Sequence, residues 1–114
     1  FFEGLEISRG QTRSGSMTTF KTYELAVEVF RLCEQLKLKG ELKNQLHRAT
    51  SSAVLNLAEG AAKPTQADKR RFYAIAYGSI REMQAILRLV NAAEQFVKAD
   101  QLGGAAWRLM KATK

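Results

Sequence analysis

Arginine and tyrosine side chains alternate along one stretch of the sequence at helical spacing. The stretch contains Arg70, Tyr73, Tyr77, Arg81, Gln84 and Arg88. Intervals of three and four residues place all of them on one face of a helix, roughly opposite the expected core. Guanidinium groups bind phosphates through paired donors, and aromatic rings stack on unpaired bases. This face therefore predicts contact with single-stranded or looped RNA, and Lys63, Lys69 and Arg71 add positive charge near its start.

Two other interpretations of this basic face stay open from the residues alone. It fits a solvated surface, and it also fits a subunit contact in which Tyr73 and Tyr77 are the anchors. The overall charge favours a polyanionic partner, RNA or DNA, because the chain has 18 basic and 11 acidic residues and a net charge of +7. Most of that excess lies after residue 60, where ten basic and four acidic residues occur.

A second polar stripe borders an apolar one between residues 41 and 59. Its members are Gln45, Arg48, Ser52, Asn56 and Glu59. Half-buried polar groups must be paired, since an unpaired one costs about 1–3 kcal/mol. The segment after residue 65 offers Ser79 and Glu82 as partners, and the small residues Ala49, Ser52 and Gly78 permit close approach. We expect a hydrogen-bonded seam that fixes the register of two helices.

Four helices are needed to position these residues, and apolar spacing predicts them at 22–37, 41–59, 66–93 and 101–113. Gly40 is the expected end of the first, Thr65 with Asp68 resembles a capping box for the third, and Asp100 is the expected N-cap of the fourth. The inner face of the third helix is expected to carry Phe72, Ile75, Ala76, Ser79, Met83, Ile86, Leu87 and Val90. Short links between the helices predict an all-α fold, an antiparallel up-and-down four-helix bundle.

Residues 1–19 mix Gly, Ser, Thr and Arg without periodicity, which predicts an irregular tail ahead of a four-helix domain at 20–114. The letters SGSM before Met17 look like a joint between fused or upstream sequence and a natural start. We find neither a secretory signal nor an apolar run of the roughly 18–20 residues that cross a bilayer. We therefore expect no membrane partner, a cytoplasmic location, and a core role for the single cysteine, Cys33.

A second apolar patch suggests self-association. Val54, Leu55 and Ala58 point away from the main apolar stripe of their helix, and Trp107 does the same in the last helix. Two helices with an additional apolar side on one small domain favour a subunit interface. We expect a homo-oligomer.

Catalytic and metal-binding patterns are not found in the sequence. His47 is the only histidine, no Glu-x-x-His pair is present, and no glycine-rich phosphate loop occurs. Glu59 and Glu82 are acidic neighbours in the expected bundle, but they lack a nucleophile or a metal to work with. We expect no catalytic residues, no metal and no cofactor, and we do not expect an enzyme.

Two spaced motifs resemble the bacterial four helix bundle protein family, whose best-known branch is encoded in intervening sequences of the large-subunit rRNA. The first comprises Arg48, Ala49, Ser52, Asn56, Leu57, Ala58, Glu59 and Gly60; the second comprises Phe72, Ile75, Ala76, Gly78, Ser79 and Glu82. The resemblance covers about residues 20–109. It implies a four-helix protomer in a ring-like homopentamer with a basic surface. A distant branch supplies accessory proteins to diversity-generating retroelements, where the pentamer binds a reverse transcriptase and nucleic acid.

These observations favour a non-enzymatic accessory protein that binds nucleic acid as a basic homo-oligomer. In this interpretation Arg70, Arg81 and Arg88 contact phosphates while Tyr73 and Tyr77 stack on bases or orient the arginines. An alternative is an oligomeric scaffold for a protein partner such as a reverse transcriptase, with nucleic acid incidental. A third is a building block fused to residues 1–16.

Overall fold

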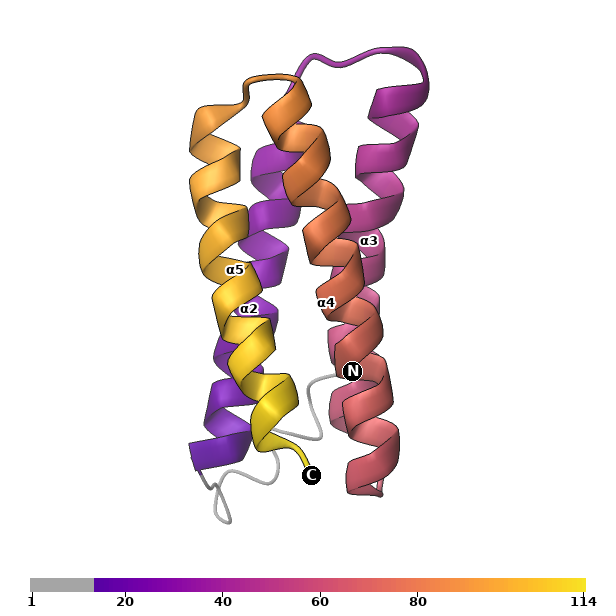
Figure 1. The fold of residues 1–114 in the computed structure, drawn as a ribbon, viewed down its shortest axis with the longest axis vertical. Coiled ribbons are helices and arrows are strands. Elements are labelled where there is room, and N and C mark those ends of the chain that lie inside the picture. The colour runs from indigo at the N-terminus through magenta and orange to yellow at the C-terminus, as the bar shows by residue number, and fades with distance from the viewer. Residues whose placement is uncertain (1–13) are drawn as a thin grey trace.

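Four helices make up the part of the chain that the computed structural model describes, which is the backbone of residues 14–114 and the side chains from residue 17 onward. The helices are α2 (Ser14–Glu34), α3 (Gly40–Ala62), α4 (Gln66–Leu89) and α5 (Ala93–Ala112). No strand occurs within that described range. Successive helices run in opposite directions along a common axis (Figure 1). The prediction of an all-α chain with four helices is confirmed.

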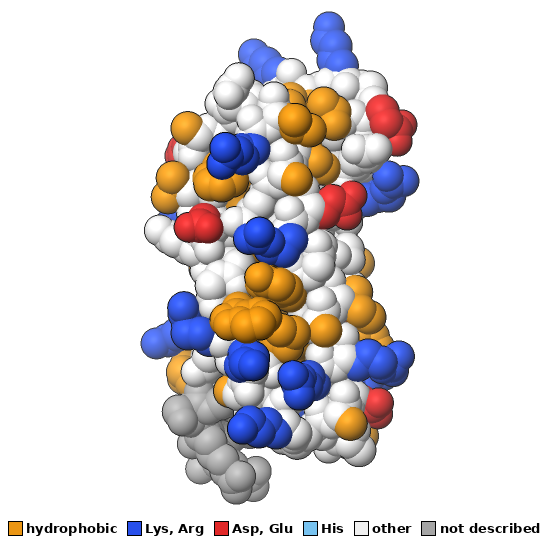
Figure 2. Space-filling model, viewed as in Figure 1, with side chains coloured by type: hydrophobic (Ala, Val, Ile, Leu, Met, Phe, Trp, Pro, Cys, Tyr) orange, Lys and Arg blue, Asp and Glu red, His pale blue; other side chains and the backbone are white. Residues whose placement is uncertain are grey.

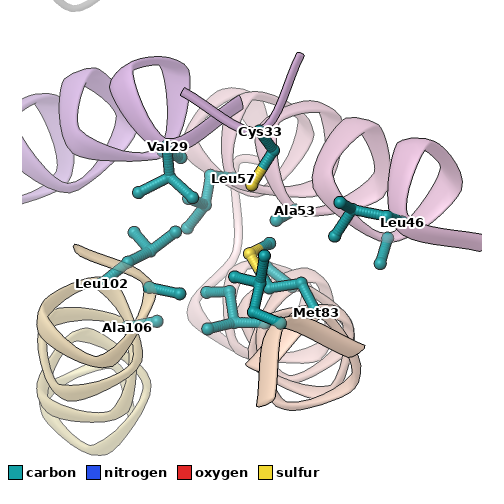
Figure 3. Close-up of a cluster of buried hydrophobic side chains, with 14 of the residues drawn as sticks. Val29, Cys33, Leu46, Ala53, Leu57, Met83, Leu102 and Ala106 are labelled. Carbon is teal, nitrogen blue, oxygen red and sulfur yellow. The ribbon is translucent and has the colours of Figure 1, made fainter. Parts of the chain in front are cut away.

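The helices form a closed ring of neighbours, in which α2 and α4 each pack against both α3 and α5. Each helix contributes fully buried side chains to the shared core, including Val29 of α2, Leu57 of α3, Met83 of α4 and Leu102 of α5. Figure 3 shows these four side chains converging on the bundle interior. Every helix therefore has two packing sides, which widens its buried face beyond a single stripe.

The first helix begins and ends earlier than the sequence pattern predicted. Residues 14–19 are helical although they were expected to belong to an irregular tail, and the other residues of that expected tail, 1–13, lie outside the described range. The helix ends at Glu34 rather than at residue 37. Gly40 begins α3 instead of ending α2, and its φ of +68° is a conformation that favours glycine.

Asn91 ends α4 earlier than predicted. Its φ is +57°, a left-handed conformation that asparagine tolerates better than most residues. The amide of Ala92 donates to the carbonyl of Leu87 at 3.0 Å, and the amide of Asn91 donates to the carbonyl of Arg88 at 3.2 Å. This pair of bonds is a Schellman motif with asparagine in the position that glycine usually takes.

Because α4 ends there, α5 begins at Ala93 rather than at residue 101. Asp100 was predicted to cap this helix, and it lies inside it instead. The predicted cap of α4 is present, since the Thr65 hydroxyl accepts a hydrogen bond from the Asp68 amide at 3.1 Å.

The buried face of α4 is turned toward α5 compared with the predicted one. Its centre carries Tyr73, Ala76, Ile80, Met83 and Leu87, all at most 2% exposed. Ile75 was predicted to face inward and is 44% exposed. The contact of α4 with α5, in addition to that with α3, covers a further part of the helix surface.

Candidate nucleic-acid interface

Tyr73 does not lie on the basic face, and its prediction as a base-stacking residue is wrong. The residue is 2% exposed. Its ring lies against α3 at Gly60, where an added Cβ would be 2.7 Å from Tyr73 Cε1. Burial raises the pKa of the Tyr73 hydroxyl, and a side-chain hydrogen bond with Thr19 partly opposes that rise. The missing side chain at Gly60 makes room for the ring, so Tyr73 joins α2, α3 and α4 and cannot stack on a ligand.

Gln84 also turns inward and connects α4 to α5. Its Nε2 donates to Asp100 Oδ1 at 3.2 Å, and its Oε1 accepts a hydrogen bond from Arg81 Nη1 at 3.3 Å. Gly103 lies next to this amide, because a Cβ there would be 3.3 Å from Gln84 Oε1. A continuous chain of hydrogen bonds thus runs from Arg81 through the buried amide to the Asp100 carboxylate.

A groove of about 380 Å³ follows this contact between α4 and α5. It is lined by Tyr77, Arg81, Gln84, Asp100, Gly103, Gly104 and Trp107. The rings of Tyr77 and Trp107 are 5.4 Å apart at an interplanar angle of 49°, and Trp107 is 45% exposed. Trp107 was predicted at a subunit interface, which a single protomer does not test; within the protomer it lies beside Tyr77, the tyrosine of the basic face.

Positively charged groups surround the groove. Lys111 Nζ lies 5.3 Å from the centre of the Trp107 ring. The Arg108 guanidinium lies over Gly104, where an added Cβ would be 3.3 Å from Nη1. Figure 2 shows this face, with hydrophobic side chains at mid-height and Lys and Arg side chains around them. The groove therefore combines an exposed aromatic ring with several cations.

On α4 and α5, five exposed cations have no acidic partner among residues 17–114. They are Arg70, Arg81, Arg88, Arg108 and Lys111. Arg81 lines the groove, and Arg108 and Lys111 lie beside it at Gly104 and Trp107. None of them takes part in the ion pairs found among residues 17–114. Their charge is available to a ligand.

Lys63 and Lys69 were predicted to contact nucleic acid, but both have structural partners at the turn between α3 and α4. Lys63 Nζ is 3.1 Å from Glu59 Oε2 and 5.0 Å from the centre of the Phe72 ring. Lys69 Nζ donates to the Ala61 carbonyl at 2.9 Å, and burial lowers the pKa of its ammonium group. These two lysines do not line the groove; their contacts stabilise the turn between α3 and α4.

Three of the predicted seam residues meet between α3 and α4. The hydroxyl oxygens of Ser52 and Ser79 share a hydrogen bond at 2.7 Å. Asn56 Nδ2 donates to the Ser52 carbonyl at 2.8 Å and approaches the Ser52 hydroxyl at 3.1 Å. This small network links the two helices at one level.

The other four predicted seam residues lie outside the contact. Arg48 and Glu82 are exposed and form no hydrogen bond or ion pair within residues 17–114, and Glu59 is exposed and pairs with Lys63. Gly78 faces open space, because no atom lies within 4 Å of an added Cβ. The prediction extended the seam too far around each helix.

The predicted interface residues of α3 differ in how exposed they are. Leu55 is 54% exposed, as an interface residue should be in an isolated protomer. Ala58 is 1% exposed and is therefore closed to a second subunit, whereas Val54 is partly buried against the core and keeps some exposed surface. The sequence pattern gave α3 one buried side, whereas α2 and α4 both pack on it.

The sequence analysis missed the contribution of α5 to the groove. Asp100, Gly104, Trp107 and Lys111 follow one another at intervals of three or four, which places them on one side of a helix. That signal was hidden because the helix was expected to begin after Asp100.

Other chemistry is sparse in the described residues. Among residues 17–114, no group of three or more His, Cys, Asp or Glu side chains could hold a metal ion. Burial, with a smaller effect of the Glu34 charge, raises the pKa of the Cys33 thiol to about 11. His47 Nδ1 lies 2.9 Å from Glu34 Oε2 on the surface. Within the same range, no helix has the length and apolar character needed to span a membrane.

Comparison with known proteins gives one result. The family model described as 23S rRNA-intervening sequence protein matches residues 18–105. This segment contains α3 and α4 in full, and with them both sequence motifs and the Ser52–Ser79 contact. No curated protein and no solved structure matches the chain. Because the matched segment covers most of the sequence, the chain belongs to the 23S rRNA-intervening sequence protein family.

Proposed function

We propose that the protein is a non-enzymatic accessory protein that binds single-stranded or looped RNA through the α4/α5 groove and acts as a homo-oligomer. The observation that carries this proposal is the position of Trp107, 45% exposed and beside Tyr77 in a groove with unpaired cations. Stacking of a base on an aromatic side chain contributes about 1–3 kcal/mol. The family name associates its members with intervening sequences of 23S rRNA, which favours RNA over DNA.

The positive charge in and beside the groove also supports a polyanionic ligand. Arg71, Lys63 and Lys98 have carboxylate partners within 4 Å, at Asp68, Glu59 and Glu28 respectively. The cations around the groove have none among the residues that the structure describes. A phosphate backbone supplies the missing negative charge and releases counterions when it binds.

Binding of a labelled 12-nucleotide single-stranded RNA, followed by fluorescence anisotropy over a range of salt concentrations, tests this proposal. Replacing Arg81→Glu together with Arg88→Glu should weaken binding and flatten the log–log salt slope by about 1.4, or about 0.7 for each phosphate contact. A matched control is Lys21→Glu with Arg31→Glu, which makes the same charge change on exposed residues of α2. Equal effects of the two pairs would contradict a defined site.

Self-association is proposed through the ridge formed by exposed apolar side chains of α3 and α4. Leu55 and Ile75 are 54% and 44% exposed. They lie about one turn from Ser52 and Ser79, in the same direction along the antiparallel pair, so the hydrogen bond between those serines places them at a similar level. The family resemblance suggests that copies joined by such contacts form a ring-like homopentamer.

Light scattering on the purified protein tests this part of the proposal. The wild-type mass should be a multiple of 12.7 kDa, and Leu55→Glu with Ile75→Glu should release protomers of that mass. A wild-type mass of 12.7 kDa at micromolar concentration would refute self-association.

A second candidate function is an oligomeric scaffold that binds a protein such as a reverse transcriptase. It is favoured by Leu89 and Val97 near the α4–α5 turn, which are 71% and 55% exposed and belong to neither surface above. A stoichiometric protein that remains bound after nuclease treatment, and that Leu89→Glu with Val97→Glu releases, would favour this function. Loss of the protein on nuclease treatment would favour RNA binding.

A further inference from the structure

The Asp100 carboxylate needs an explanation in a groove that binds RNA, because it repels phosphates. Asp100 is exposed and receives one hydrogen bond, from Gln84 Nε2 to Oδ1 at 3.2 Å. No cation forms an ion pair with it within residues 17–114. Asp100 lines the groove, its second oxygen has no hydrogen bond within residues 17–114, and an ionised carboxylate can only accept hydrogen bonds. A ligand group that suits it must present donors.

Gly104 provides the second observation. Glycine inside a helix is less favourable than alanine by about 1 kcal/mol. Packing does not require it, because the only atoms within 4 Å of an added Cβ belong to the flexible end of the Arg108 side chain. The absence of a side chain leaves a strip of helix backbone within the groove between Asp100 and Trp107, covered only by the mobile end of the Arg108 side chain.

The dimensions of this strip suit a planar base. Asp100 and Trp107 are about two turns apart, or about 10 Å along the helix axis. Side chains on a helix lean toward its N-terminus, so the indole of Trp107 leans toward Gly104 and shortens the gap. A base that takes the place of the Arg108 guanidinium over this backbone, against the indole, has its edge near the carboxylate.

The carboxylate distinguishes among the four RNA bases by their hydrogen-bonding edges. Guanine presents two adjacent donors, N1–H and the N2 amino group, on its Watson–Crick edge. Adenine and cytosine present one amino donor next to an acceptor, and uracil presents one N–H between two acceptors. Acceptors next to the donor are repelled by the second carboxylate oxygen, so guanine alone matches both oxygens.

We propose that the α4/α5 groove binds one unpaired guanine of the RNA, with Asp100 on its Watson–Crick edge and Trp107 against its ring. Arg81 and Arg108 then bind the flanking phosphates, and the hydrogen bond from Gln84 holds the Asp100 carboxylate in place. This inference rests on the proposed function and adds a base preference to it.

The experiment compares fluorescein-labelled nonamers of uridine that carry guanosine, adenosine, inosine or uridine at the central position. The guanosine RNA should bind about tenfold more tightly than the uridine RNA, as expected for one good two-bond contact to a base edge. Inosine lacks the N2 amino group and should lose most of this preference. Asp100→Asn should reduce the preference to less than about twofold, and it should leave binding of the uridine RNA equal or slightly tighter because a negative charge is removed.

Glu94→Gln is the matched control, because it neutralises an exposed carboxylate on the same helix outside the groove. It should keep the guanosine preference. Equal binding of all four RNAs by the wild type would overturn the guanine site and leave RNA binding intact, whereas binding of none would refute the proposed function as well. A guanosine preference that survives Asp100→Asn in a variant with wild-type circular dichroism would overturn the role of the carboxylate.

Discussion

The ring of Tyr73 occupies the space next to Gly60, where an added Cβ would be 2.7 Å from Cε1 and 2.9 Å from Cδ1. Gly60→Ala should therefore displace the ring and lower the free energy of unfolding by about 1–3 kcal/mol, the usual range for overpacking. Urea denaturation followed by circular dichroism measures this. Gly78→Ala is the control, since open space surrounds that position and helix propensity should add up to about 1 kcal/mol. Equal stability of the two variants would contradict the packing of Tyr73.

The hydrogen bond between Ser52 and Ser79 predicts an energetic coupling between α3 and α4. Ser52→Ala and Ser79→Ala, made singly and together, should give a coupling energy of about 0.5–1.5 kcal/mol in a double-mutant cycle. The single change at Ser52 should be the more costly of the two, because Asn56 also approaches that hydroxyl. Purely additive effects would show that the pair does not join the helices.

Gly104→Ala should separate stability from binding. Helix propensity should raise the free energy of unfolding by up to about 1 kcal/mol, because only the end of Arg108 must move. The same methyl group fills part of the space over the Gly104 backbone that the base would use, so affinity for the guanosine nonamer should fall. Gly78→Ala should gain stability with unchanged affinity. A Gly104→Ala variant that binds RNA like the wild type would argue against a base over α5.

Stability should decrease at alkaline pH. Burial raises the pKa of Cys33 to about 11 from an ordinary value of 9.0. The folded thiol thus keeps its proton at pH values where the unfolded one has lost it, so its contribution is complete below about pH 9 and is lost as pH rises toward 11. Tyr73 acts in the same direction, because burial raises the pKa of its hydroxyl as well.

Urea denaturation from pH 8 to pH 11 tests this, with Cys33→Ala as the comparison. The variant should lose less stability per pH unit than the wild type above pH 9. Because Cys33 is the only cysteine in the chain, slow reaction of the native protein with a thiol reagent at pH 8 reports the same burial. Identical pH profiles would show that the thiol is already ionisable in the folded state.

The sequence was sufficient for the fold class because heptad-like apolar spacing is strong over long helices. It located α3 within a few residues and identified Thr65 as the cap of α4. The end of α4 was not predicted correctly, because the left-handed residue there is Asn91 and no glycine or proline marks the position. That one error displaced the predicted start of α5. Asp100 was therefore predicted as a cap, although it lies inside the helix.

The site was predicted in part for a related reason. Helical spacing correctly grouped Tyr77 with Arg81, but it could not show that Tyr73 and Gln84 are covered by neighbouring helices. Spacing along one helix does not reveal which of its sides meets a neighbour. The groove depends on side chains from α4 and α5 together, and the pairing of Tyr77 with Trp107 is a tertiary contact that neither helix encodes alone.

Emission from Trp107 during titration with single-stranded RNA tests the central claim most directly, because it is the only tryptophan in the chain. The account predicts a saturable change in emission that follows the anisotropy binding curve, is reversed by salt, and is lost when Arg81→Glu and Arg88→Glu are combined. RNA binding detected by anisotropy without any change in Trp107 emission would contradict the placement of the RNA in the α4/α5 groove, and no binding at low salt would contradict the proposed function itself.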